Sequence, residues 1–305
     1  MTRTLRFSTY HVEVSNEDKA WFRGGGITKG EVVEYYRDVA PVMLSFLRGR
    51  PITMERYPDG IEEDGFYQRN APEHFPGWIE RARLEKEGGT VEQAVCRRAA
   101  DLVYMVNQGC ITPHAWLSRA ESPWWPDIMV FDLDPPGDDF PAVRAAAHDT
   151  REVLSEVGLA TLVQTSGSRG LHIVVPLDGS SDFDEVREFA QGVAEVLVLR
   201  APAARTTEQY KANRGSRIFI DTLRNSYGQS FAAPYSVRTR PGAPVAMPVD
   251  WDELEDVHPK AFTIRNARDR IADASNPWKG MRRRARSLRE PRKRLEGMLE
   301  ELRRR

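Results

Sequence analysis

Hydrophobic and polar positions along the chain recur in patterns that predict a mixture of helices and strands. Apolar residues at helical spacing follow Thr28, which stands at capping-box spacing from Glu31, and Gly49 ends this stripe. The same spacing predicts helices over residues 90–107, 140–157 and 182–199. Short apolar or alternating runs bounded by Pro, Gly and polar residues predict strands over residues 11–15, 51–57, 128–133, 159–165, 171–177, 217–223 and 235–240.

From residue 128 on, these elements follow the order strand, helix, strand, strand, helix, strand. That order predicts an α/β fold with a mixed core around one sheet and with flanking helices. A length of 305 residues allows one or two domains, and no internal repeat or low-complexity linker divides the chain. We expect one compact unit over residues 1–278 and a basic helix or tail over residues 279–305.

Composition narrows the class of protein. A chain with 40% hydrophobic and 29% charged residues is not disordered as a whole. No apolar run reaches the length of a membrane span, and the N-terminus lacks the apolar segment of a signal peptide. Two cysteines, Cys96 and Cys110, are too few for a disulfide framework or a four-cysteine zinc site. We therefore expect a cytoplasmic protein with no membrane partner.

The net charge of −1 hides a strong asymmetry along the chain. Residues 279–305 hold twelve Lys and Arg against four Asp and Glu, a local charge of +8, which leaves −9 for the rest. Such a basic end is typical of an arm that contacts phosphate. A solvated C-terminal helix is an equal alternative, with its inner side formed by Leu288, Leu295, Leu299 and Leu302.

Two aspartates end the apolar strand predicted at residues 128–133. Asp132 and Asp134 are two positions apart, so their carboxylates project to one side of a strand. Adjacent carboxylates repel each other unless a cation lies between them, and hard oxygen ligands suit Mg²⁺ or Mn²⁺. The alternative is a polar turn before Pro135 and Pro136.

A third aspartate strengthens the metal hypothesis. Asp221 ends the apolar run 218–220, where a carboxylate is costly unless it is paired or binds a metal. Three carboxylates at two strand ends meet the needs of a two-metal site for nucleotidyl transfer. Taken alone, Asp221 is also explained as a strand-end cap.

The loop Ser166-Gly167-Ser168-Arg169-Gly170, followed by Leu171-His172, lies between two predicted strands. Its glycines, hydroxyls and backbone N–H groups allow close approach to an anion, and Arg169 adds charge. His172 opens the next strand, from which it can reach a phosphate oxygen. The alternative is an ordinary turn followed by a core histidine.

Several scattered residues could serve the same site. Lys29 lies in the first turn of a helix, where anions are favoured, and Lys19 precedes it by ten residues. Phe66 and Tyr67 could stack on a base, although such a pair more often belongs to a small core. His114 stands in an apolar stretch, where a buried core histidine is the default expectation.

Arginines also stand near the predicted metal site. Arg224 follows Asp221 by three residues. Arg238 and Arg240 would lie on one face of the strand predicted at 235–240, and paired arginines suit a triphosphate. On a strand edge such arginines are more often simply solvated.

Together these motifs resemble the archaeo-eukaryotic primase superfamily, and most of all the polymerase domain of bacterial DNA ligase D, an end-joining repair enzyme that works with Ku. The resemblance runs from about residue 16 to residue 254. It implies an α/β, mixed-sheet primase-type catalytic core with flanking helices. Further matching motifs are Asp18-Lys19, Thr28-Lys29-Gly30-Glu31, Arg56-Tyr57-Pro58-Asp59-Gly60, Asn107-Gln108-Gly109, Ala233-Pro234-Tyr235-Ser236-Val237-Arg238, Arg240-Pro241-Gly242-Ala243-Pro244-Val245 and Trp251.

The resemblance implies a role for each matching residue. The catalytic metal ligands, for two Mn²⁺ or Mg²⁺ ions, would be Asp132, Asp134 and Asp221. The nucleoside triphosphate would be bound by Lys29, Ser166, His172, Arg224, Arg238 and Arg240. Phe66 and Tyr67 would stack on the incoming base, and His114 would meet the ribose 2′-hydroxyl.

The resemblance also implies contacts with DNA. Lys19, with Lys29 nearby, would bind the 5′-phosphate at a gap or overhang, and Lys211 with Arg214 would help to bridge two DNA ends. The expected partners are gapped or 5′-phosphorylated DNA, nucleoside triphosphates, Ku and a separate DNA ligase, and the expected location is the bacterial nucleoid during repair.

The chain departs from the family pattern in three ways. Arg169 stands where the family more often has Lys, and the stretch after Lys19 lacks the usual proline. The chain also has no lysine motif for ligase adenylation and no nuclease module, so we expect an excised domain or a stand-alone homologue.

The sequence therefore predicts a metal-dependent polymerase that adds nucleotides, ribonucleotides preferred, to DNA 3′ ends and fills gaps in end joining. A sugar-nucleotide transferase also uses an Asp-x-Asp pair, but it explains neither Asp221 nor the loop before His172. A non-catalytic module that bridges DNA ends is the other alternative, and the clustered acids disfavour it because they repel DNA.

Overall fold

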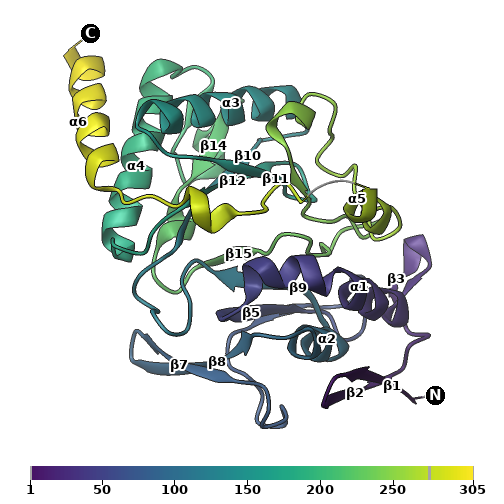
Figure 1. The fold of residues 1–305 in the computed structure, drawn as a ribbon. Coiled ribbons are helices and arrows are strands. Elements are labelled where there is room, and N and C mark those ends of the chain that lie inside the picture. The colour runs from purple at the N-terminus through teal and green to yellow at the C-terminus, as the bar shows by residue number, and fades with distance from the viewer. Residues whose placement is uncertain (1, 274–275, 305) are drawn as a thin grey trace. The chain divides into compact units, whose positions relative to one another are not determined.

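The computed structural model describes residues 2–273 and 276–304 and has a mixed α/β architecture (Figure 1). Packing divides the chain into two compact units. Unit 1 comprises the chain up to Glu121 together with Ser230–Met247 and Ala261–Asn276. Unit 2 comprises Ser122–Gln229, Pro248–Lys260 and the chain from Pro277 on.

Unit 1 is built on a six-stranded sheet whose central strands are buried. The sheet has the order β15-β9-β5-β8-β7, and β6 also pairs with β5. The first helix begins as the sequence predicts, because the Thr28 hydroxyl accepts from the backbone N–H of Glu31 while the Glu31 carboxylate accepts from the backbone N–H of Thr28. The elements are β1 (Thr2–Phe7), β2 (Tyr10–Ser15), β3 (Ala20–Phe22), β4 (Ile27–Thr28), α1 (Lys29–Leu47), β5 (Arg50–Arg56), β6 (Phe66–Gln68), β7 (Arg81–Lys86), β8 (Gly89–Cys96), α2 (Ala99–Asn107), β9 (Cys110–Trp116), β15 (Ser230–Ala232) and α5 (Ala267–Asp273).

Unit 2 is built on a second six-stranded sheet, of order β13-β14-β10-β12-β11-β16. All pairs are antiparallel except β13 with β14, so this sheet is mixed. Residues 128–131 of β10 are fully buried, as expected for a central strand. The elements are β10 (Ile128–Asp134), α3 (Phe140–Glu156), β11 (Leu162–Thr165), β12 (Leu171–Pro176), α4 (Phe183–Arg200), β13 (Arg205–Thr206), η2 (Lys211–Asn213), β14 (Ile218–Asp221), η3 (Leu223–Asn225), β16 (Pro248–Val249), η4 (Trp251–Glu253), η5 (Met281–Arg284) and α6 (Arg289–Arg304).

Three details of the predicted architecture are wrong. The core contains two large sheets and not one. Residues 90–107 do not form a single helix, since β8 precedes α2 and pairs with both β7 and β5. The apolar residues of β8 are buried on both faces near its end, and a continuous apolar run does not distinguish a buried strand from a helix.

The third error concerns residues 235–240, where the sequence predicts a strand. Only an isolated bridge joins Val237 to Val245 there, and Tyr235 has a positive φ of 68°. A left-handed backbone at Tyr235 interrupts the extended conformation that the side-chain pattern favours.

The basic C-terminal segment is a helix that belongs to unit 2. Leu288 and Leu295 are buried, while Leu299 and Leu302 are half-buried, so the inner side predicted from sequence is confirmed. The helix α6 packs on α4 where Gly192 leaves room for Leu295. No helix in the ranges 2–273 and 276–304 is long and apolar enough to cross a membrane. The assignment of residues 1–278 to one catalytic unit stays a prediction.

Candidate functional site

A row of three polar side chains crosses the centre of the unit 2 sheet. In β10, Asp132 lies directly opposite His172 of β12 on one side and opposite Asp221 of β14 on the other. Residues directly opposite in antiparallel strands have side chains on the same face of the sheet. Long-range strand pairing therefore gathers two aspartates and a histidine from three distant segments.

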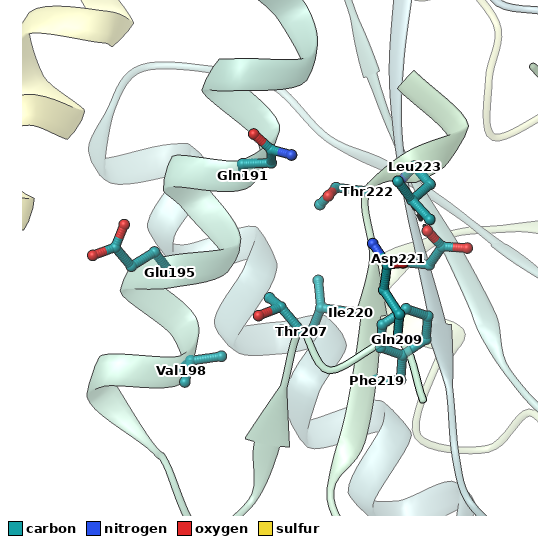
Figure 2. Close-up of a pocket in the computed structure, with 10 residues that line it drawn as sticks. All are labelled: Gln191, Glu195, Val198, Thr207, Gln209, Phe219, Ile220, Asp221, Thr222 and Leu223. Atoms are coloured by element: carbon teal, nitrogen blue, oxygen red, sulfur yellow. Dashed lines mark hydrogen bonds between the residues drawn. The ribbon is translucent and has the colours of Figure 1, made fainter. Parts of the chain in front are cut away.

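Asp134 extends this row along the same face of β10, two residues beyond Asp132. Its Oδ1 atom lies 3.5 Å from Nη2 of Arg169, which belongs to the loop between β11 and β12. Figure 2 shows the Asp221 carboxylate directed away from Gln191 and Glu195 of α4. Because Asp132 lies opposite Asp221, both carboxylates face away from α4.

Burial and mutual repulsion both act on these carboxylates. The pKa of Asp134 and that of Asp221 are raised, first by burial and then by the charge of Asp132. The backbone N–H of Leu223 donates to Oδ1 of Asp221 at 2.8 Å, and Arg224 offsets part of the repulsion. The site is thus a cluster of negative charge that gains from a nearby cation.

Cationic and N–H donor groups already converge on the cluster. Nε of Arg224 lies 3.8 Å from Oδ2 of Asp132 and 3.8 Å from Oδ2 of Asp221. Nε2 of His172 lies 3.6 Å from Oδ1 of Asp132. Two carboxylates that approach one guanidinium at equal distance define a position where positive charge is stabilised.

The donor set fits a hard divalent cation, because every acidic group in it is a carboxylate. In the part of the chain that the structure describes, however, no three acidic, His or Cys side chains are close enough to hold a metal ion as they stand. If these residues bind a metal, the carboxylates of Asp132, Asp134 and Asp221 must come closer together than they are here. Metal ligation by these residues stays a prediction.

The loop after β11 is held tightly against β10. Oγ of Ser166 accepts from the backbone N–H groups of Ser168 at 3.2 Å and of Gly170 at 3.1 Å. A Cβ atom on Gly170 would lie only 2.0 Å from the carbonyl oxygen of Leu133. Only glycine permits this approach, which brings the loop next to the two aspartates of β10.

A buried glutamine that the sequence analysis missed orients His172. The side-chain amide nitrogen of Gln164, which is fully buried, lies 2.9 Å from Nδ1 of His172. Where the amide N–H donates to Nδ1, the neutral ring carries its proton on Nε2. In this tautomer His172 presents an N–H donor to Asp132.

Asn225 is a second residue that the sequence analysis missed. Its buried amide donates to the carbonyl oxygen of Val130 at 2.7 Å and accepts from the backbone N–H of Val130 at 2.8 Å. This pair of bonds joins η3 to β10 and so fixes the segment that carries Arg224. An asparagine in a polar loop gives no local signal of such a contact.

In unit 1, His114 of β9 forms a buried pair with Glu55 of β5. Oε2 of Glu55 lies 3.0 Å from Nε2 of His114, and Oε1 accepts from the Thr239 hydroxyl at 2.8 Å. Burial tends to raise the pKa of Glu55, but the hydrogen bonds and charge of His114, the Thr239 bond and Arg238 outweigh it and lower that pKa to about 2. His114 therefore lies against a carboxylate that is ionised at neutral pH, a partner that an ordinary core histidine does not need.

Two aromatic side chains beside this pair are exposed. Phe66 is 47% exposed and Tyr67 is 63% exposed. The alternative that these two rings belong to a small core is therefore wrong. The rings of Tyr67 and His114 meet edge to face at 5.4 Å. Their strand β6 starts just after Gly65, where a Cβ would lie 2.2 Å from the ring of Tyr57. The exposed ring of Tyr67, with Phe66 next to it on β6, thus lies against the buried His114.

Lys19 and Lys29 lie together at the start of α1. The backbone N–H of Lys29 donates to the carbonyl oxygen of Lys19 at 2.8 Å. The Lys29 side chain is buried, and burial followed by the charge of Lys19 lowers its pKa to about 8. Lys19 is more exposed and forms an ion pair with Asp59. Two cations held this close favour an anion between them.

The remaining predicted residues differ in exposure. Lys211 is exposed in η2, whereas Arg214 is buried, donates to the carbonyl oxygens of Glu208 and Gln209, and lies 3.6 Å above the ring of Phe219. The guanidinium of Arg214 thus already holds its own loop in place.

Arg238 and Arg240 belong to unit 1. Because no strand forms over residues 235–240, strand alternation does not place these two arginines on one face. Their role with a nucleotide stays a prediction that rests on the family resemblance.

Known proteins match nearly all of this chain. A family model described as "LigD, primase-polymerase domain" matches residues 28–278. The multifunctional non-homologous end joining DNA repair protein LigD of Mycobacterium tuberculosis is 32% identical over 274 residues, which is 87% of this chain and 36% of that protein. The bifunctional non-homologous end joining protein LigD of Bacillus subtilis is 30% identical over 270 residues, which is 88% of this chain and 43% of that protein.

A solved structure described as "Polymerase Domain from Mycobacterium tuberculosis Ligase D in complex with DNA" has the same fold. Its TM-score is 0.83 at 30% identity, and the match covers 90% of this chain and 99% of that one. The chain spans less than half the length of the curated relatives that it matches. By family match, sequence identity and fold, the chain belongs to the LigD primase-polymerase domain family.

Proposed function

We propose that this chain is a metal-dependent nucleotidyltransferase that adds nucleotides to DNA 3′ ends and fills gaps during non-homologous end joining. The observation that carries the proposal is the row of Asp221, Asp132 and His172 across three neighbouring strands. A transferase of this kind needs clustered carboxylates for cations and N–H donors for phosphate oxygens. The row supplies both within one face of one sheet.

The carboxylates of Asp132, Asp134 and Asp221 are the proposed ligands of Mg²⁺ or Mn²⁺. When bound, such ions lower the pKa of the primer 3′-hydroxyl and neutralise the triphosphate. The raised pKa of Asp134 and that of Asp221 support the proposal, because their repulsion is relieved by a cation.

The chain's own groups position the nucleotide. His172, whose Nδ1 lies 2.9 Å from the amide nitrogen of Gln164, donates from Nε2 to a phosphate oxygen in the proposed complex. Ser166 accepts two backbone N–H bonds and can still donate its hydroxyl proton. The guanidinium of Arg224, beside Asp132 and Asp221, would bind a phosphate oxygen. Such fixed donors act by positioning and by charge stabilisation.

A preference for ribonucleotides is part of the proposal. Glu55 fixes one nitrogen of His114, and the exposed rings of Phe66 and Tyr67 beside it suit a stacked base. A hydrogen bond from the imidazole to a 2′-hydroxyl is worth about 1–2 kcal/mol, which corresponds to a preference of about 5- to 30-fold.

DNA ends, Ku and a separate DNA ligase are the proposed partners. The relatives are LigD proteins of end joining, and the solved neighbour is in complex with DNA. Lys19 and Lys29 are the proposed ligands of a 5′-phosphate at a gap, since they present two close cations at a helix start.

Primer extension on a gapped duplex tests the proposed function. The wild-type chain is incubated with each ribo- and deoxyribonucleotide, with Mn²⁺, Mg²⁺ or EDTA, and with or without a 5′-phosphate across the gap. We expect extension that needs a divalent cation, favours ribonucleotides and improves with the 5′-phosphate. Absence of extension under every combination would contradict the proposal.

A further inference from the structure

A short segment before α6 carries only positive charges. Residues 279–288, which we call the basic strap, contain no Asp or Glu. All their cationic side chains are exposed. These cations are Lys279, Arg282, Arg283, Arg284 and Arg286.

The strap is nevertheless well anchored to unit 2. The indole N–H of the buried Trp278 donates to the carbonyl oxygen of Val163 at 3.2 Å. Met281 and Leu288 are also buried. Arg286 forms a parallel bridge with Leu177, just beyond the end of β12. The strap is the yellow segment that leads into α6 in Figure 1. Apolar anchors and backbone pairing thus hold the cations on a fixed surface.

The cations of α6 behave differently from those of the strap. Arg292 lies within 4.0 Å of both Glu185 and Glu188 on α4, and Arg303 pairs with Glu195. Within residues 2–273 and 276–304, no ion pair involves a strap cation. Charge on α6 therefore stabilises the contact with α4, whereas charge on the strap is presented to solvent.

Closely spaced cations without ion pairs on an anchored segment suit a polyanion, because each repels its neighbours until phosphates lie between them. The strap exposes no large apolar side chain, which disfavours a protein partner bound through an apolar core. Regularly spaced phosphates of duplex DNA fit best, since they need point charges and no base contact.

We propose that the basic strap binds the phosphate backbone of the DNA duplex beyond the reaction site. This inference rests on the proposed function and adds a surface that lies outside the matched family residues 28–278. His172 lies near the start of β12. Leu177, which pairs with Arg286 of the strap, comes directly after the end of this strand. Five residues of strand span about 17 Å, the rise of about five base pairs. The strap therefore contacts flanking duplex and not the incoming nucleotide.

The test measures how duplex affinity depends on salt in the full chain. The variant Arg282→Gln/Arg283→Gln/Arg284→Gln removes three exposed cations. The matched control Arg292→Gln/Lys293→Gln/Arg303→Gln removes three cations that form ion pairs with glutamates. A further variant, Arg282→Lys/Arg283→Lys/Arg284→Lys, keeps the charge. Each protein is titrated with a 24-base-pair duplex at several salt concentrations, and circular dichroism checks the fold.

Each lost phosphate contact reduces the slope of log affinity against log salt by about 0.9. Loss of three contacts should make the fall in affinity between 50 and 200 mM salt about 40-fold smaller for the glutamine strap variant. We expect the lysine variant and the control to keep the wild-type slope. Equal slopes for the glutamine strap variant and the control would overturn the proposal.

The strap proposal and the proposed function would fail with different experimental results. If the wild type extends a primer but the strap variant keeps the wild-type slope, the strap proposal fails and the proposed function stands. If the wild type neither binds duplex DNA nor extends a primer, both fail.

Discussion

Lys29 offers a prediction that joins stability to function. The structure buries this lysine at the start of α1 and lowers its pKa from 10.5 to about 8, by burial first and by Lys19 second. A lysine with a lowered pKa in the folded state opposes folding whenever it must be charged. We therefore expect Lys29→Met, which keeps the volume and removes the charge, to stabilise the protein.

The magnitude follows from the two pKa values. Between about pH 8 and 10.5 the unfolded lysine holds a proton that the folded one has lost, so the free energy of unfolding rises with pH in this window. The penalty is fully present below the folded pKa and is about 3 kcal/mol at pH 7. It falls to about 1.5 kcal/mol at pH 9.5. Lys29→Met should therefore gain about 3 kcal/mol at pH 7 and about half of that at pH 9.5.

Urea denaturation of the wild type and of Lys29→Met at pH 7 and pH 9.5 measures both gains. Lys19→Met is the matched control, because that side chain is 37% exposed and should change stability by less than about 0.5 kcal/mol. Either substitution should weaken binding of a 5′-phosphorylated gap by about 5- to 30-fold. A gain for Lys29→Met that is equal at both pH values would refute the charge argument, and a loss of stability would refute the reasoning outright.

Two further predictions concern the loop before β12 and the histidine of unit 1. Gly170→Ala should destabilise the protein by about 1–3 kcal/mol and slow primer extension, because its Cβ collides with the carbonyl oxygen of Leu133; unchanged unfolding and extension would show that the loop yields freely. His114→Ala should lower the efficiency with ribonucleotides about 5- to 30-fold while affecting deoxyribonucleotides less, and an unchanged ratio of the two efficiencies would remove His114 from the site.

Asp132, Asp134, Asp221 and His172 show how much of a site can be predicted from a sequence. Apolar runs that end in Asp132, Asp134 and Asp221 are visible locally, and so is the glycine-rich loop before His172. The position of Asp132 opposite both Asp221 and His172 depends on register between distant strands. That register is set by packing of the whole sheet, which no local pattern contains.

The supporting residues were harder to predict. Glu55 and Gln164 stand within apolar strands, where a polar residue has no local partner to reveal its role. Each becomes meaningful only when β5 pairs with β9 or β11 pairs with β12 and brings a histidine within reach. The error at residues 90–107 has a similar cause, since pairing of β8 with two neighbours overrides the helical spacing.

The carboxylates of Asp132, Asp134 and Asp221 are the groups that we propose to be essential for nucleotide addition. The most direct measurement compares extension on a gapped duplex at saturating Mn²⁺ for the wild type, Asp132→Ala and the exposed control Asp138→Ala, with DNA affinity measured in parallel. We predict extension by the wild type and the control, none by Asp132→Ala, and DNA affinity in Asp132→Ala no weaker than in the wild type, because the removed charge repels phosphate. Extension by Asp132→Ala at the wild-type rate would contradict the account.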